Sequence, residues 1–322
     1  MLKNPPKCKA RNRCVQVAKN TKLSKTITVR KITLILFLFG FVLNYGHCQN
    51  NPKTLLWKVT KANSNKISYL FGTFHQVNPD FFDSLAIATN YLKRSEILFV
   101  ESYNSETAID SNKITSEFNS WNKDKWKSKL KPSQFDIFEK FIKSEWGNEK
   151  IYSMPPIQLM FILQYIYFQG VCDTINRKSY EPMDDRITSI ALSNKLIVVG
   201  LDENQLLDIK KSSEQDKALS LKNTIHINEQ YMKYILEKNI NNSTAKFLFD
   251  YKKFNLNYSL NKRSKALKVL LNDRNNKWMK KISNQFKMKN CFVAIGIRHL
   301  FYKTGLIQQL RQQGYKVEPI EI

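Results

Sequence analysis

The sequence predicts an α/β fold: a single domain in which a mainly parallel central sheet is flanked by helices and interrupted by helical insertions. Short apolar runs rich in β-branched and aromatic residues stop at a glycine or a charged residue, as buried parallel strands do. Long stretches with helical spacing of apolar residues separate these runs. No linker rich in Gly, Pro or Ser divides residues 49–322. This alternation of strands and helices favours a layered α/β architecture.

Four runs are expected to form strands of the sheet, and they are residues 67–71, 97–100, 196–199 and 291–295. The clearest helix spans residues 155–168, because it begins at a proline, which the first helical turn tolerates, and ends before Gly170. Gln158 and Gln164 interrupt its apolar run, which indicates a buried core helix and not a membrane span.

The first 48 residues have the composition of a secretory signal peptide. Residues 1–31 contain ten Lys or Arg and no acidic residue, and an apolar run follows at residues 32–43. The run is shorter than the roughly 20 residues that span a bilayer as a helix. Small residues at the expected positions favour cleavage before Gln49, and acylation of Cys48, as in a lipoprotein, is the alternative.

Much of the net charge belongs to this leader. The chain carries +25 over 322 residues, and +15 remains without residues 1–48, spread over two basic blocks at 121–150 and 205–289 that are expected to be helical. Lys outnumbers Arg 42 to 10 among many Asn and Ser, which is typical of solvated helix faces. We therefore expect no specific nucleic-acid partner, and membrane contact only through the leader or through surface charge.

The composition also bounds the core and the cysteine chemistry. Hydrophobic residues make up 42% of the chain, which excludes a mainly disordered protein. Five cysteines are too few for a disulfide-stapled scaffold. After the leader only Cys172 and Cys291 remain; they could pair in an oxidising compartment, although two separate buried thiols are the favoured interpretation.

Two of the histidines occur in the same local setting. One predicted strand leads into Gly72, with His75 three positions later, and another leads into Gly296 and then His299. A third predicted strand runs into Glu101. In open α/β sheets ligands bind outside the carboxyl ends of the strands, so these side chains are expected to meet at one edge.

Two imidazoles and one carboxylate at one edge can hold a divalent transition metal with open coordination positions. Such a metal would polarise a substrate carbonyl or make hydroxide from bound water. A single Gly-x-x-His usually marks a turn, but two copies that each follow an apolar strand favour a shared site. The sequence therefore predicts His75, Glu101 and His299 as ligands of Mn, Co or Zn. His226 lacks this setting and is expected on a helix surface.

The same segments resemble the TraB/GumN family, whose animal relatives include the Tiki proteins, membrane-tethered metalloproteases that clip an extracellular signalling protein. The resemblance covers essentially residues 54–320 and rests on the order and spacing of several weak matches. These are the opening Leu-Trp-Lys-Val before the first expected strand, the segment from Gly72 to His75, Glu101, Asp185 with Ile187 and Ala191, residues 196–205, residues 273–278, residues 292–300, Gly305-Leu306 and Gly314-Tyr315-Lys-Val.

The resemblance implies an α/β fold related to erythromycin esterase-like and ChaN-like proteins, and a metal-dependent active site. Carried over to this chain, the metal ligands are His75, Glu101 and His299. The likeness to Tiki favours a peptide amide as the substrate bond, whereas the residue types alone leave amide and ester open. The family often has Gly three residues after the second histidine, where this chain has Tyr302, so the turn there is expected to differ.

Five further polar residues near the motifs have more than one interpretation. Asp185 and the pair Arg274 and Asn275 match the family pattern and are expected to serve structure, as a helix cap and a buried polar contact. Arg298 could stabilise an anionic intermediate or bind a substrate carboxylate, or be a surface arginine. Asp202 could orient a metal-bound histidine or cap a helix.

The sequence favours an exported metal-dependent hydrolase, peptidase-like, acting on a peptide or small molecule in the periplasm, cell envelope or extracellular space. Glu101 and Arg298 are its candidate catalytic residues. A non-catalytic envelope protein that binds a metal or another ligand at the same edge is the alternative. Residues 1–48 are assigned to a signal peptide and residues 49–322 to one TraB/GumN-like domain.

Overall fold

The computed structural model describes residues 52–103, 121–174, 181–203, 205–264 and 267–322. The expected signal peptide and its cleavage site lie outside these residues. Residues Asn51–Ile322 form one compact unit. Within the described part of this unit, none of the helices combines the length and the apolar character needed to cross a membrane.

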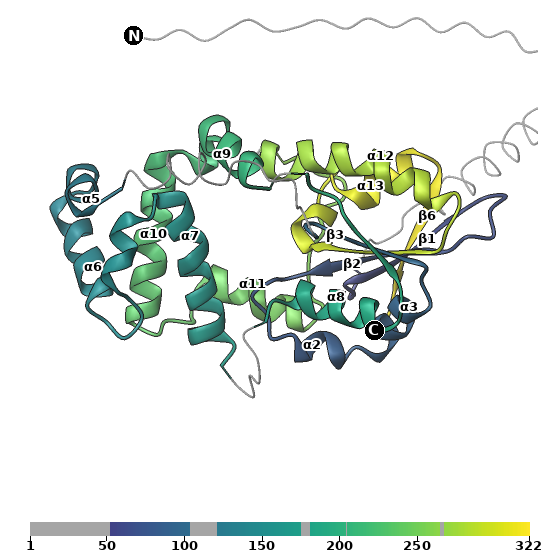
Figure 1. The fold of residues 1–322 in the computed structure, drawn as a ribbon, viewed down its shortest axis with the longest axis horizontal. Coiled ribbons are helices and arrows are strands. Elements are labelled where there is room, and N and C mark those ends of the chain that lie inside the picture. Colours follow the sequence, from purple (N-terminus) through teal and green to yellow (C-terminus); the bar gives the residue numbers. More distant parts are fainter. Residues whose placement is uncertain (1–51, 104–120, 175–180, 204, 265–266) are drawn as a thin grey trace, which may run out of the picture. The chain divides into compact units, whose positions relative to one another are not determined.

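A six-stranded mixed sheet forms the centre of the fold (Figure 1). Its strands are β1 (Leu56–Lys61), β2 (Ser68–Thr73), β3 (Ile97–Val100), β4 (Ile197–Gly200), β5 (Cys291–Gly296) and β6 (Tyr315–Ile320). They lie in the order β4-β3-β5-β2-β1-β6. Parallel pairs join β2 to β5, β5 to β3 and β3 to β4, whereas β1 runs antiparallel to both β2 and β6. The predicted α/β class with a mainly parallel sheet is confirmed.

All four predicted strands are present, with ends displaced by two residues at most. The opening Leu-Trp-Lys-Val was expected to precede the first strand, but it lies within β1 itself. Strand β6 was not predicted either. It forms an edge of the sheet, where alternate side chains are partly exposed, so its sequence mixes charged residues with apolar ones and lacks a continuous apolar run.

Helices connect the strands and carry most of the remaining chain. The α-helices are α2 (Asp80–Asp83), α3 (Ala86–Lys93), α5 (Lys123–Lys129), α6 (Pro132–Ile142), α7 (Pro156–Tyr165), α8 (Met183–Ser193), α9 (Gln205–Gln215), α10 (Leu221–Leu236), α11 (Ser243–Lys252), α12 (Arg274–Phe286) and α13 (Leu306–Gln312). The 3₁₀-helices are η2 (Glu149–Ser153), η4 (Lys217–Leu219) and η6 (Ile297–Leu300), and the π-helices are η3 (Ile166–Cys172) and η5 (Lys268–Asp273). His226 is exposed on α10, as predicted.

The helix predicted over residues 155–168 continues further than expected. Helix α7 passes directly into η3, a π-helix that includes Gly170. A Cβ atom at this glycine would lie 2.5 Å from the ring of Trp146, so the glycine permits close packing and does not end the helix. The predicted end before Gly170 is therefore wrong.

Helices cover both faces of the sheet, with α12 and α13 on one side and α2, α3 and α8 on the other (Figure 1). Helix α8 packs against β3, β4 and β5. Helix α10 packs against α6 and α7, which accounts for the predicted helical insertions. The two described cysteines are free thiols, as favoured from the sequence; Cys291 is buried as expected, whereas Cys172 is partly exposed.

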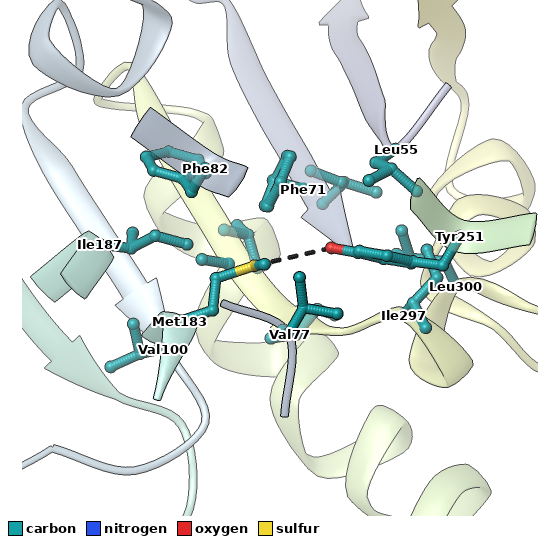
Figure 2. Close-up of a cluster of buried hydrophobic side chains, with 14 of the residues drawn as sticks. Leu55, Phe71, Val77, Phe82, Val100, Met183, Ile187, Tyr251, Ile297 and Leu300 are labelled. Atoms are coloured by element: carbon teal, nitrogen blue, oxygen red, sulfur yellow. Dashed lines mark hydrogen bonds between the residues drawn. The ribbon is translucent and has the colours of Figure 1, made fainter. Parts of the chain in front are cut away.

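A buried apolar cluster holds the end of β2 against α8 and α11 (Figure 2). Phe71 of β2 and Met183 of α8 are both fully buried, and burying side chains of this size contributes about 1.5–3 kcal/mol each. The Tyr251 hydroxyl of α11 donates to the Gly72 carbonyl oxygen at 2.8 Å and lies 3.6 Å from the Met183 sulfur. The cluster therefore fixes the strand end from which the first histidine motif begins.

Candidate active site

Three neighbouring parallel strands, β2, β5 and β3, deliver the two histidines and the glutamate to one edge of the sheet. In the register of β2 and β5, Thr73 lies beside Gly296, so both Gly-x-x-His motifs leave the sheet at the same level. Glu101 follows directly after β3, and β3 pairs with β5 on the side of β5 opposite to β2. His299 lies in η6, which begins immediately after β5.

The three side chains meet around Gly296. A methyl group added to this glycine would lie 2.9 Å from Glu101 Oε1, 3.7 Å from His299 Cδ2 and 4.0 Å from His75 Nε2. The Gly296 backbone N–H donates to Glu101 Oε1 at 2.7 Å, and His299 Nε2 lies 3.7 Å from the same oxygen. The expected convergence at the sheet edge is therefore present, while a metal-binding role remains a prediction.

His75 is oriented by a carboxylate that the sequence did not single out. Its Nδ1 is hydrogen bonded to Oδ2 of Asp184, in the first turn of α8, and the Thr73 hydroxyl donates to Oδ1 of the same carboxylate at 2.8 Å. The charge of Asp184 raises the pKa of His75 to about 9 against the opposing effect of burial. The neighbouring Asp185 matched the family pattern, but no cap hydrogen bond from a side chain is found at the start of α8, so its expected role as a helix cap is wrong.

His299 is held through its other ring nitrogen by an amide. Its Nδ1 lies 2.7 Å from Asn275 Oδ1, while the Asn275 amide group donates to the backbone oxygens of His299 and Thr304. The Nδ1–H group therefore donates its hydrogen bond to the amide oxygen, and the lone pair of the neutral ring is on Nε2. Burial lowers the pKa of His299 to about 3, so this ring is neutral at physiological pH.

Arg274 is the central cation of the site. Its Nη2 lies 2.5 Å from Glu101 Oε2 and 2.5 Å from Asp202 Oδ2, and its Nη1 lies 3.2 Å from His299 Nε2. Burial alone would raise the pKa of Glu101, but the charge of Arg274 holds it well below its usual range. Arg274 and Asn275 were expected to make a buried polar contact; both are buried, and their partners are the predicted ligands Glu101 and His299.

Asp202 contacts the site through this arginine and not through a histidine. It binds Arg274 and also accepts a hydrogen bond from Trp278 Nε1 at 2.7 Å. Burial raises the pKa of Asp202, whereas the arginine opposes the rise. The expectation that Asp202 orients a metal-bound histidine directly is therefore not met in this structure.

Sequence comparison assigns the chain to a family. A family model described as the TraB/PrgY/gumN family matches residues 55–319, which is most of the chain. The chain belongs to the TraB/PrgY/gumN family. Neither a curated protein nor a solved structure matches it. The matched region of this TraB/PrgY/gumN protein contains both Gly-x-x-His motifs, Glu101 and Arg274.

The donor set of this TraB/PrgY/gumN protein suits a divalent transition metal in type and orientation. In each histidine Nδ1 is engaged by a hydrogen bond, as is usual for metal-binding histidines, so a metal would bind at Nε2. At His75 it would have to displace the Nε2 proton, because the pKa of this ring is about 9. The absent side chain of Gly296 leaves a cradle between the three donors. Two carboxylates, those of Glu101 and Asp202, contact one arginine, so their combined charge exceeds that of the guanidinium.

The position of Arg274 limits this fit in the arrangement shown. Among the residues that the structure describes, no three His, Cys, Asp or Glu side chains are already spaced to hold a metal ion. The guanidinium donates to His299 Nε2, so a metal held by His75, Glu101 and His299 together requires the guanidinium to leave that nitrogen. The guanidinium also makes two hydrogen bonds to Asp202, and these could hold it after it has moved away from His299.

Arg298 of this TraB/PrgY/gumN protein faces a neighbouring cavity. Its side chain is exposed and lies over the ring of Phe247, 5.1 Å from the ring centroid. The cavity, of about 410 Å³, is lined by Arg298 together with Phe247, Phe301 and Tyr302. Tyr302, where a glycine is common in the family, has a φ of 67°, in the left-handed region that glycine favours.

Proposed function

We propose that this TraB/PrgY/gumN protein is an exported, metal-dependent hydrolase. The observation that supports the proposal most is the convergence of His75 Nε2, Glu101 Oε1 and the His299 ring on the cradle at Gly296. Asp184 and Asn275 orient the two rings through their Nδ1 atoms, so a metal would bind at the Nε2 atoms once the Arg274 guanidinium has left His299 and the Nε2 proton has left His75. The leader at residues 1–48 supports export.

His75, Glu101 and His299 would hold the metal, which we expect to be Mn, Co or Zn. When bound, it would polarise a substrate carbonyl and lower the pKa of a bound water. The protein's own residues supply the rest. Asp184 fixes the ring of His75, and Arg274 offers N–H groups to negative charge that develops beside Glu101. Burial of Glu101, Arg274 and His299 excludes bulk water and strengthens these interactions.

The substrate is a peptide or a small molecule with an amide or ester bond. A peptide amide is preferred because the family resemblance includes the Tiki metalloproteases. Nothing in the donor set distinguishes the two bonds, since the carbonyl of either is activated in the same way. The expected location is the periplasm, the cell envelope or the extracellular space.

Metal analysis of the full chain tests the proposal. We expect about one Mn, Co or Zn per chain, lost in His75→Ala and in His299→Ala and reduced in Glu101→Ala. Gly296→Ala is the sharpest variant, since it keeps every ligand and fills the cradle with a methyl group 2.9 Å from Glu101 Oε1. The φ angle of Gly296 is −49°, which alanine readily adopts. The variant should therefore fold normally but bind no metal.

Gly314→Ala is the matched control. A Cβ atom there has no neighbour within 4 Å, and its φ of 81° means that the substitution costs about 1 kcal/mol of stability without touching the site. Unchanged metal content in both histidine variants would contradict the proposal. Stoichiometric metal without hydrolysis of a broad peptide and ester library would instead support the alternative, an envelope metal- or ligand-binding protein.

A further inference from the structure

The cavity beside Arg298 is joined to the candidate active site through aromatic rings. Phe74, the residue before His75, packs edge-on against Phe247 with ring centroids 5.8 Å apart. Phe247 in turn lies under the guanidinium of Arg298, the residue before His299. The residues that precede the two histidines therefore both contact Phe247, a residue of the cavity wall, so the cavity lies beside the candidate active site.

The chemistry of the cavity wall combines one cation with apolar surface. Phe247 and Phe301 pack against each other with ring centroids 6.3 Å apart, and Tyr302 lies beside them in the lining. Among the residues that the structure describes, no carboxylate forms an ion pair with Arg298. The other charged residue of the lining, Asp250, is already paired with Lys246 at 2.7 Å, so its charge is largely balanced.

A guanidinium that lies over the face of an aromatic ring, as that of Arg298 does, can still use its N–H groups to bind a planar anion. Guanidinium groups bind carboxylates through two parallel hydrogen bonds, and stacking on an aromatic face leaves those donors available. A cavity of about 410 Å³ has the size of a small-ligand pocket and accommodates an apolar side chain. The lining therefore suits a carboxylate next to an apolar or aromatic group.

We propose that this cavity is a substrate subsite in which Arg298 binds a carboxylate and the rings of Phe247 and Phe301 bind the adjacent apolar side chain. The inference rests on the proposed hydrolase function and specifies its substrate: a peptide or acyl compound with a free carboxylate close to the bond that is cleaved. The carboxylate is either the C-terminus of a peptide or the side chain of an acidic residue.

Binding of small probes to the full chain tests this inference without requiring hydrolysis. We expect calorimetry to show that N-acetylphenylalanine binds on the order of tenfold more tightly than its amide, since a hydrogen-bonded charge pair contributes about that factor. Arg298→Gln should remove the preference. Arg94→Gln, which changes an exposed arginine after α3, should keep it.

A second pair of probes identifies the source of the carboxylate. Acetyl-Phe-Glu-amide and acetyl-Phe-Gln-amide differ only in a side-chain charge; a preference for the first indicates an acidic side chain, and its absence indicates a C-terminus. Equal binding of all charged and neutral probes, no binding of any, or a preference that survives Arg298→Gln would overturn the inference. Metal content, measured on the same samples, reports separately on the proposed hydrolase site.

Discussion

Asp184 holds His75 in place from a helix 109 residues further along the chain, through a hydrogen bond between its Oδ2 and the imidazole Nδ1. The Thr73 hydroxyl, at the end of β2, donates to the other carboxylate oxygen. The Asp184 carboxylate therefore links the start of α8 to the end of β2 and to His75. The side chain of His75 is 43% exposed, and that of Asp184 is 14% exposed. The ring is therefore oriented firmly while its Nε2 stays accessible from the cradle.

Asp184→Asn tests this pair through the titration of His75. Without the carboxylate charge, the pKa of His75 should fall from about 9 towards its ordinary value of 6.5. Because the folded protein holds the proton more tightly than the unfolded chain, the pair stabilises the fold fully below about pH 6.5 and loses this effect as the pH rises through 9. The variant should therefore lower the unfolding temperature more at pH 6 than at pH 10. Imidazole NMR and thermal unfolding measure both effects.

Asp185→Asn is the control for that experiment, because it removes a neighbouring carboxylate on the same helix. It should leave the titration of His75 close to that of the unchanged protein. An equal loss of stability at pH 6 and pH 10 in Asp184→Asn would contradict the ion pair and indicate a packing effect alone.

Arg274→Met should destabilise the fold by about 3–5 kcal/mol at neutral pH, because it leaves the buried carboxylates of Glu101 and Asp202 without a cation. The arginine holds the pKa of Glu101 below its unfolded value, so its stabilising effect is present above about pH 4.5 and is lost as the pH falls. The loss of unfolding free energy should therefore be smaller at acid pH, where the buried carboxylates of the variant take up protons. Urea unfolding at pH 7 and pH 4 measures the difference.

Arg311→Met provides a matched comparison. This arginine is half-buried and donates to the Val317 carbonyl oxygen at 2.7 Å. Arg311→Met should lower the free energy of unfolding by less than Arg274→Met does, and this loss should vary little with pH. If the two variants show the same pH dependence, the carboxylates are not the reason for the effect of Arg274. Under the proposed function Arg274→Met should also tighten metal binding, since the guanidinium no longer competes for His299 Nε2.

The part of the site that follows strand ends could be predicted from the sequence. His75, Glu101 and His299 each come shortly after a run of buried apolar residues, and parallel neighbours place such positions at one edge. The same logic identified the sheet and four of its strands. It failed for β6, whose alternation of buried and exposed side chains carries a weaker signal than a continuous apolar run.

The residues that orient the ligands could not be assigned in this way, because they come from helices. Asp184 and Asp185 are adjacent carboxylates, and only the rotation of α8 decides which one faces His75. Arg274 and Asn275 lie at the start of α12, where η5, a π-helix, gives way to an α-helix. Such transitions are frequent at functional sites, but they depend on tertiary packing and leave no clear pattern in the sequence.

Tyr251→Phe tests how the site depends on its support. The Tyr251 hydroxyl contacts the Gly72 carbonyl of β2 and the Met183 sulfur of α8, so it joins the two elements that carry His75 and Asp184. Tyr258→Phe is the matched variant, since its hydroxyl is equally buried and donates to the Thr54 carbonyl at 2.6 Å, away from the site. Both variants should lose about 1 kcal/mol of unfolding free energy with the hydrogen bond. Only Tyr251→Phe should shift the pKa of His75, because only its hydroxyl sets the spacing of the two elements. NMR titration alongside urea unfolding separates the effects, and an equal response of His75 in both variants would show that general stability, and not this contact, positions the histidine.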